Sequence, residues 1–280
     1  MNAIEIKGLC KSFKDFSIDN VDLVLPGGCI VGLVGENGAG KSTTIKLILN
    51  LLFKDSGSIR VLGRDNEKEL DLVKEDIGVV FDEAYFPPSL SAEKLGNILK
   101  HIYRSWDEKR YKSYLESFEL PVKRPIGKLS RGMKMKLSIA AAMSHNAKLL
   151  LLDEATSGLD PVVRDDILDI LNDFTRDEEH SILISSHIVS DLEKICDYIA
   201  FMHKGKLMLF EEKDKLIEHY GVIHCTKEEL DKLDPKTVIG KKTGSYGSEA
   251  IVLKTAVPKG IQSYPIDIEK LFVFMIKERE

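Results

Sequence analysis

A glycine-rich stretch near the N-terminus constrains this sequence more than any other feature. The residues GENGAGKST, positions 35 to 43, fit the pattern G-x-x-x-x-G-K-[ST]. An unbroken apolar run precedes them at residues 29–34, and apolar residues with helical spacing follow at residues 42–52. A buried strand, a tight loop and a helix in this order predict a parallel α/β sheet with an anion-binding loop at the end of one strand.

The residue types in this loop suit the phosphates of a nucleotide. Glycines let successive backbone N–H groups point into one cup, and the start of the helix adds positive potential. Lys41 is expected to hold the β- and γ-phosphates of ATP, and the hydroxyl of Ser42 to ligate Mg²⁺, which prefers oxygen ligands. A glycine turn beside a surface lysine is the alternative interpretation. The expected nucleotide contacts in the loop are Gly35, Asn37, Gly38, Ala39, Gly40, Lys41, Ser42 and Thr43.

Two carboxylates follow a second apolar run in the sequence LLLLDE, residues 149–154. The carboxyl ends of parallel strands line the binding crevice of such a sheet. We therefore expect Asp153 to bind the metal through water and Glu154 to polarise the attacking water. An acidic pair that caps the next helix is the alternative interpretation.

Strand-like and helical patterns alternate along most of the chain. The pattern predicts a mainly parallel sheet covered by helices on both faces, in a domain of residues 1–221 with a helical subdomain at about residues 84–145. Residues 222–280 differ in composition and predict a small α+β accessory segment. Expected strands lie within residues 1–30 (two, antiparallel), 55–65 (a hairpin), 77–81, 149–152, 182–185 and around 203–206 (a hairpin), and expected helices at 91–120, 130–145, 162–175, up to Gly221, and 268–277.

Charge and hydropathy exclude several classes of protein. A formal net charge of −5 gives no broad basic surface for nucleic acid. No segment approaches the roughly 18 to 20 consecutive apolar residues that span a bilayer, and the first residues lack the apolar centre of a signal peptide. We expect a cytosolic protein. The four cysteines form no CxxC pair and no ligand-spaced set with histidine, so we expect buried thiols.

Three further stretches together resemble one family. LSRGM at residues 129–133 is similar to the LSGGQ signature of ABC-type ATPases, SGLD at 157–160 resembles their D-loop, and SSH at 185–187 resembles the segment with their switch histidine. With the phosphate loop and the acidic pair, the matches run in the family's order and spacing. The resemblance implies an α/β P-loop NTPase fold, that is, an ABC-type nucleotide-binding domain with a helical subdomain, an antiparallel β subdomain and, here, the C-terminal α+β appendage.

The resemblance also implies that two such domains pair head to tail. The γ-phosphate held by Lys41 of one domain would then face Ser130 and Gly132 of the other. A serine hydroxyl and a glycine N–H at a helix start can both donate to phosphate oxygens. Ser130 alone would be a helix N-cap, and both roles can coexist.

Three more residues take roles from the same resemblance. His187 is expected to hydrogen-bond the γ-phosphate and to orient Glu154. Phe13 corresponds to the aromatic residue that stacks on adenine, and Phe16 is the competing ring. Asp160, in the stretch that resembles the D-loop, is counted with the nucleotide contacts.

Two positions depart from the family's pattern. Asp82 stands where the family has a glutamine that contacts Mg²⁺ and the attacking water and links the site to the membrane partner. A shorter, charged side chain could ligate the metal more strongly or could fail to reach it. In the signature, Arg131 and Met133 replace a glycine and a glutamine, and Arg131 could add phosphate affinity or simply face solvent.

These observations predict the ATPase subunit of an ABC transporter, an enzyme that converts ATP and water to ADP and phosphate with Mg²⁺. It would lie in the cytoplasm, peripherally on the inner face of the cell membrane, and bind separate membrane permease subunits. ATP sandwiched between two subunits would close the dimer and hydrolysis would open it. A homodimer is favoured over a heterodimer because Glu154 and His187 are both present. The sequence resembles most the subunits of small bacterial exporters of drugs or peptides.

The expected docking surface for the permease combines residues 82–88 with the helical insertion and its aromatics Tyr103, Trp106 and Tyr111, although a helical core explains these aromatics equally well. The alternative function is a non-transport ABC ATPase that acts on a nucleic-acid or ribosomal partner. A single phosphate loop and the short interval from Lys41 to Ser130, without sustained heptads, argue against it and against nucleic acid as a partner. For residues 222–280 three roles remain open: regulation, an extension of the dimer contact, or packing only.

Overall fold

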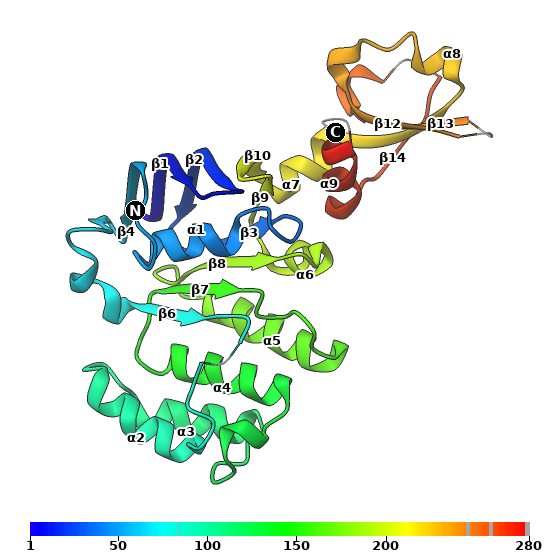
Figure 1. The fold of residues 1–280 in the computed structure, drawn as a ribbon. Helices are drawn as coiled ribbons and strands as arrows, with labels where there is room; N and C mark the ends of the chain where they lie inside the picture. Colours follow the sequence, from blue (N-terminus) through cyan, green and yellow to red (C-terminus); the bar gives the residue numbers. More distant parts are fainter. Residues whose placement is uncertain (84, 245–246, 258–259, 278–280) are drawn as a thin grey trace.

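A six-stranded sheet forms the centre of the computed structural model, which describes residues 1–83, 85–244, 247–257 and 260–277. Its strand order is β10-β9-β3-β8-β7-β6 (Figure 1). Neighbouring strands from β9 to β6 run parallel, and β10 pairs antiparallel with β9. The predicted parallel α/β sheet is thereby confirmed. Its strands are β3 (Ile30–Val34), β6 (Ile77–Val80), β7 (Leu149–Asp153), β8 (Ser181–Ser186), β9 (Tyr198–His203) and β10 (Lys206–Glu212).

Different layers cover the two faces of this sheet. On one face, α1 (Lys41–Ile48) shares an apolar core with an antiparallel sheet of order β2-β1-β4-β5. On the other face, α4 (Arg131–Met143), α5 (Pro161–Phe174) and α6 (Val189–Ile195) share the largest core with β7 and β8. The antiparallel sheet consists of β1 (Asn2–Ser12), β2 (Ser17–Pro26), β4 (Ser56–Val61) and β5 (Arg64–Asp65), and the short helices η1 (Leu70–Leu72) and η2 (Lys74–Asp76) lead from it to β6.

The helical insertion has a small core of its own. The single helical pattern expected over residues 91–120 is two helices, α2 (Ala92–Ile102) and α3 (Glu108–Ser117), because Asp107 starts a new helix by accepting from the backbone N–H of Arg110 at 2.9 Å. Ser91 caps α2 as predicted. The 3₁₀ turn η3 (Ile126–Lys128) then leads into α4.

Of the two interpretations left open for the aromatics of the insertion, the structure shows the helical core. Tyr111 is buried and donates its hydroxyl to the carbonyl of Ala92 at 2.9 Å. The ring of Trp106 packs 4.9 Å from that of Tyr111, and the ring of Tyr103 lies flat against His145 with centroids 3.9 Å apart. These rings are therefore engaged inside the subunit.

The expectation of four buried cysteines is wrong for three of them. Cys196 is buried, whereas Cys10, Cys29 and Cys225 are half-buried. The three lie near strand ends or on outward-facing positions, where the core does not enclose them.

The C-terminal residues form the predicted α+β appendage (Figure 1). Its antiparallel sheet has the order β12-β13-β11-β14. The helix expected to end at Gly221 ends at His219, and Gly221 lies in the first strand of this sheet. The elements are α7 (Lys213–His219), β11 (Tyr220–Cys225), α8 (Lys227–Leu230), η4 (Pro235–Thr237), β12 (Val238–Gly244), β13 (Gly247–Leu253), η5 (Lys254–Ala256), β14 (Ser263–Tyr264) and α9 (Ile268–Lys277).

The helices of the described residues are all too short or too polar to traverse a lipid bilayer.

Candidate functional site

The glycine-rich loop joins the end of β3 to the start of α1. Gly38 and Gly40 have φ angles of 83° and 109°, a region that residues with a Cβ rarely occupy. At Gly40 a Cβ would also lie 2.6 Å from the side chain of Ile18. The glycines thus let the chain turn tightly and leave the N-terminus of α1 facing the carboxyl edge of the sheet, where the positive end of a helix favours phosphate.

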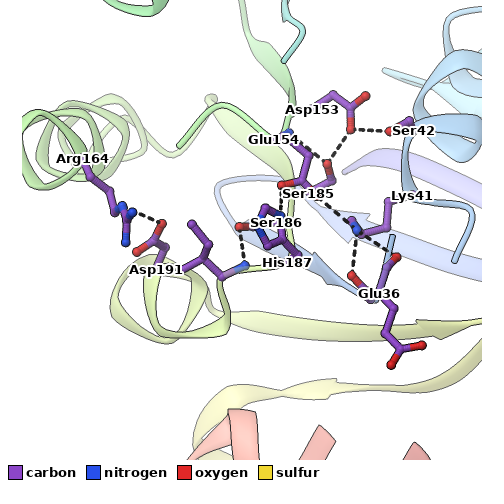
Figure 2. A network of polar contacts seen from close by, with 12 residues as sticks. Glu36, Lys41, Ser42, Asp153, Glu154, Arg164, Ser185, Ser186, His187 and Asp191 are labelled. Atoms are coloured by element: carbon purple, nitrogen blue, oxygen red, sulfur yellow. Dashed lines mark hydrogen bonds and ion pairs between the residues drawn. The ribbon is translucent and has the colours of Figure 1, made fainter. Parts of the chain in front are cut away.

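Lys41, the first residue of α1, lies folded back under the loop (Figure 2). Its Nζ donates to the carbonyl oxygens of Gly35 at 2.7 Å and Glu36 at 3.3 Å. The same ammonium lies 3.1 Å from Oε1 of Glu154. The side chain is buried, so its charge is matched within the site rather than by water.

Ser42 and Asp153 meet at the end of β7, as the sequence predicts for a metal site. The hydroxyl of Ser42 donates to Oδ1 of Asp153 at 2.9 Å, and the hydroxyl of Ser185 donates to the same oxygen at 2.6 Å. Asp153 is 3% exposed, and no ion pair among the described residues involves it. A buried carboxylate beside a hydroxyl, with only oxygen donors, fits Mg²⁺ completed by phosphate oxygens and water.

Glu154 sits between two nitrogen groups. Its Oε2 lies 2.6 Å from Nδ1 of His187, and its Oε1 faces Lys41 (Figure 2). Its backbone has a φ of 53°, a left-handed conformation that costs a non-glycine residue about 1–2 kcal/mol. The backbone N–H holds this turn by donating to the carbonyl and the hydroxyl of Ser185, each at 3.1 Å. The structure thus brings Lys41, Glu154 and His187 together.

Ser185 is a residue of this site whose role the sequence alone did not indicate. It bonds both Asp153 and Glu154, and it does so because β7 and β8 pair in parallel with Asp153 opposite Ser185. Its only sequence signal was its place two residues before His187. The strand register that gives it a role is not visible in a single sequence.

Phe13 lies where a ring could cover a nucleotide base. It is 42% exposed and lines a hollow of about 630 Å³ together with Phe16, Gly38 of the glycine-rich loop and Lys204. The rings of Phe13 and Phe16 stack with centroids 6.2 Å apart. Phe16 is half-buried and packs against the core of the antiparallel sheet, so Phe13 has the freer face.

Ser130, Gly132 and Asp160 lie apart from this cluster. Ser130 caps α4 by accepting from the N–H of Met133 at 3.2 Å, and Asp160 caps α5 by accepting from the N–H of Val163 at 3.1 Å. None of the hydrogen bonds or ion pairs of the described residues joins these three to the glycine-rich loop. Within one chain, the predicted site is therefore in two halves.

Asp82 is exposed and lies at the carboxyl edge of the sheet, just beyond the end of β6. It lines a hollow of about 360 Å³ with Glu83 and with Arg131, Lys134 and Met135 at the start of α4. In the part of the chain that the structure describes, no hydrogen bond or ion pair links Asp82 to Ser42 or Asp153. Its metal role stays a prediction.

Known proteins with the same features are ATP-binding subunits. A family model described as "ABC transporter" matches residues 18–157. The ABC transporter ATP-binding protein YtrB of Bacillus subtilis is 30% identical over 96% of this chain and 97% of its own length. The lantibiotic transport ATP-binding protein SrtF of Streptococcus pyogenes is 36% identical over 75% of this chain and 91% of its own length. A solved structure of an ATP-binding subunit of an ABC transporter superposes with a TM-score of 0.69 and 27% identity, over 76% of this chain and 91% of that one.

Proposed function

This chain belongs to the ABC transporter family as an ATP-binding subunit with ATPase activity, and on that premise we propose that it powers the export of peptides or drugs through separate membrane permease subunits. The similarity to a lantibiotic transport protein supports the exporter assignment. Through its permease, the subunit would sit peripherally on the inner face of the membrane.

The main observation in favour of a functional dimer is that the two halves of the predicted site lie apart within one chain. One half, with Lys41, Glu154 and His187, can hold and hydrolyse a nucleotide. The other half, Ser130 and Gly132, presents a hydroxyl and a helix start that are exposed or half-buried and bind no phosphate loop in their own chain. We propose that a second copy of this chain, placed head to tail, supplies the missing half to each site. ATP between the copies then closes the dimer, and hydrolysis releases it.

We propose distinct contacts for Lys41, Glu154 and His187 with the γ-phosphate and the attacking water. The ammonium of Lys41 lies 3.1 Å from Oε1 of Glu154. A bound γ-phosphate offers the ammonium a more highly charged partner, which frees Oε1 of Glu154 to orient and deprotonate the attacking water. His187 holds the other oxygen of Glu154 through Nδ1. A phosphate oxygen only accepts, so Nε2 would bond the γ-phosphate by donating, with both ring nitrogens protonated.

The metal belongs to the same proposal. Ser42 would hold Mg²⁺ through its hydroxyl and Asp153 through water, with Asp82 as a third candidate. The bound ion supplies neutralisation of charge on the phosphate oxygens. The proposed nucleotide contacts remain the glycine-rich loop residues, Phe13 and Asp160, with Ser130 and Gly132 from the partner copy.

We propose that the permease docks on the described residues of the 82–88 loop and on α2. The engaged aromatics of the insertion do not serve this purpose, but three other apolar side chains do. Tyr85, Ile98 and Ile102 are 73%, 43% and 61% exposed, and the latter two lie on α2. Apolar groups with this exposure suit the centre of a protein interface. We further propose that residues 1–221 form the ATPase domain and 222–280 the accessory segment.

The first experiment compares ATP hydrolysis and molecular size of the wild type and Glu154→Gln, with and without Mg·ATP. We expect Glu154→Gln to hydrolyse ATP at least about a hundredfold more slowly, because it lacks the base, and to accumulate as an ATP-dependent dimer. Glu179→Gln is the matched control, since it makes the same chemical change on an exposed residue before the amino end of β8 and should resemble the wild type. If Glu154→Gln keeps its activity and stays monomeric with ATP, the homodimer proposal and the base assignment are both wrong.

The export part needs its own measurement. The chain is purified together with membrane subunits from its host, and hydrolysis is measured in vesicles with peptide antibiotics and drugs. Stimulation by such compounds supports export. Hydrolysis that responds to none of them, while a binding-protein-delivered nutrient stimulates it, overturns the exporter assignment.

A further inference from the structure

An arginine and an aspartate outside the proposed mechanism lie next to the catalytic cluster (Figure 2). Arg164 is in the first turns of α5, and Asp191 is in the first turn of α6. Nε of Arg164 lies 3.8 Å from Oδ2 of Asp191, with side chains 27% and 4% exposed. Both facing atoms are buried and make no hydrogen bond, so this is an ion pair that has not closed into a hydrogen bond.

The same guanidinium also holds the loop that follows Glu154. Nη2 of Arg164 donates to the carbonyl of Leu159 at 3.3 Å. Leu159 belongs to residues 157–160, here called the D-loop segment. An arginine can serve two acceptors at once because its five N–H donors form a rigid planar fork, whereas a lysine ammonium is a single point charge.

The opposite end of this link leads to His187. Asp191 lies four residues after His187, at the beginning of the helix that follows it. The turn between them is closed by Ser186, whose hydroxyl accepts from the N–H of Ile188 at 2.9 Å, and by a backbone bond from Asp191 to Ile188 at 3.2 Å. A shift of Asp191 therefore moves the backbone that carries the His187 ring.

The D-loop segment is in contact with the signature residues on its other side. A Cβ placed on Gly158 would lie 2.7 Å from Nη1 of Arg131, so that guanidinium rests on the segment. A Cβ on Gly132 would lie 3.3 Å from the side chain of Val163 and 3.9 Å from that of Leu159. The start of α4 and the beginning of α5 with the D-loop segment are therefore in close packing contact.

We propose that Arg164 is a positioning residue that couples the D-loop segment to His187, so that what the signature half of a subunit binds alters the catalytic half of the same subunit. This rests on the proposed head-to-tail dimer, in which the signature residues contact the partner's nucleotide. The ion pair can shorten to a charge-assisted hydrogen bond of about 2.8 Å with a movement of only about 1 Å. Such a movement changes the alignment of His187 and Glu154, which are 2.6 Å apart.

A second ion pair between the same two helices provides a matched control. Lys194 of α6 bonds Asp165 of α5 at 2.8 Å, with side chains 60% and 62% exposed. It bridges α5 and α6 as the Arg164 pair does, but neither side chain is bonded to the D-loop segment or to the residues around His187. Breaking the Lys194–Asp165 pair tests whether the loss of any ion pair between α5 and α6 lowers kcat.

The experiment measures kcat, KM for ATP and thermal stability for Arg164→Met, Arg164→Lys, Asp191→Asn, the double variant Arg164→Met with Asp191→Asn, and Lys194→Met. For Arg164→Met we expect kcat to fall about tenfold with KM within about twofold, because nucleotide binding is intact while His187 is misaligned. Arg164→Lys should recover part of the loss, since it keeps the charge and loses the fork. The double variant should be no slower than the slower single variant, because both residues belong to one link. Lys194→Met should keep the wild-type kcat.

Equal kcat values for Arg164→Met and Lys194→Met would overturn the proposal. It would also be overturned if the fold-loss of kcat in the double variant equalled the product of the fold-losses in Arg164→Met and Asp191→Asn. Because Arg164→Met leaves the buried carboxylate of Asp191 without its ion-pair partner, the melting temperature of this variant is measured too. If Arg164→Met does not fold, Arg164→Lys, which keeps the charge, is compared with Lys194→Met instead, and equal kcat values for that pair overturn the proposal. Failure of the proposed dimer has a separate signature: Glu154→Gln then stays monomeric with ATP whatever the Arg164 variants do.

Discussion

Phe13 and Phe16 divide two tasks between neighbouring rings. Phe13 is 42% exposed and borders the hollow beside Gly38, whereas Phe16 packs into the core of the antiparallel sheet. Gly40 has no room for a side chain partly because Phe16 lies there, with its Cζ 3.1 Å from where a Cβ would be. One ring is thus available to a ligand and the other supports the glycine-rich loop.

We predict that Phe13→Ala weakens ATP binding about three- to tenfold, the magnitude of one lost aromatic stacking contact, without lowering the melting temperature. Phe16→Ala should instead lower the melting temperature, because it removes a ring from the core. Both are made in the Glu154→Gln background, where ATP is not consumed, and ATP affinity is measured by titration calorimetry. Unchanged affinity in Phe13→Ala would show that adenine is held elsewhere.

At the scale of single residues, the sequence could indicate the loop, the acidic pair and the histidine, because each follows an apolar strand at the same edge of a parallel sheet. It could not indicate the pairing of Lys41 with Glu154 or the role of Ser185. These contacts depend on the distance between strands and on their register, which are fixed by packing. The position of Asp82 beside Arg131 and Lys134 likewise follows from how α4 meets β6.

The junction between the helical insertion and the central sheet contains a buried histidine. His145 lies in the turn between α4 and β7, and its Nδ1 is 2.9 Å from the carbonyl of Glu75. A carbonyl only accepts, so Nδ1 carries the proton, and Nε2 is buried without a hydrogen-bond partner. Burial lowers the pKa of His145 from its ordinary value, with the bond to Glu75 acting in the opposite direction.

This lowered pKa predicts a loss of stability in mild acid. In the unfolded chain His145 gains a proton below about pH 6.5, but in the folded protein it resists protonation until a lower pH. Between these values the unfolded state binds more protons, so the free energy of unfolding falls as the pH falls, with a slope of at most about 1.4 kcal/mol per pH unit. Melting temperatures between about pH 7 and about pH 5 should therefore fall less steeply for His145→Gln than for the wild type. His101→Gln, which changes an exposed histidine on α2, is the control and should show the wild-type dependence of melting temperature on pH. If the melting temperatures of His101→Gln and His145→Gln fall equally with pH, the prediction is wrong.

At the scale of elements, periodicity located most helices and strands because burial on one or two faces leaves a pattern in the sequence. The hairpins at 55–65 and near residue 204, the cap of α2 and the helix at 268–277 were all predictable in this way. The break at Asp107 was not, because α2 and α3 have similar polar and apolar spacing on either side of it. The exposure of Cys10, Cys29 and Cys225 was missed because composition alone does not show which face of a strand a residue occupies.

At the scale of the whole molecule, the accessory segment and the catalytic sheet share one core. The ring of Phe272 on α9 packs against Phe201 of β9 with centroids 5.1 Å apart, and both belong to the largest apolar cluster together with Leu192 of α6. A second, smaller cluster lies within the accessory segment and includes Leu233 and Val252. The C-terminal helix is thus packed onto the helix that follows His187, together with Val222 and Ile251 of the accessory sheet, while Leu233 and Val252 lie in the separate cluster.

This arrangement predicts that two core substitutions in the accessory segment act at different distances. Phe272→Ala removes a ring that is 8% exposed from the shared core, so it should destabilise the catalytic domain by about 3–5 kcal/mol. Leu233→Ala, 7% exposed in the separate cluster, should lose about 2–5 kcal/mol only within the accessory segment. Trp106 makes the distinction measurable, because it is the single tryptophan of the chain and lies in the helical insertion, far along the chain from both sites. In urea, the unfolding midpoint reported by Trp106 fluorescence should shift for Phe272→Ala and stay in place for Leu233→Ala. An unshifted midpoint in Phe272→Ala would mean that residues 222–280 unfold on their own and would contradict a core shared with the catalytic sheet.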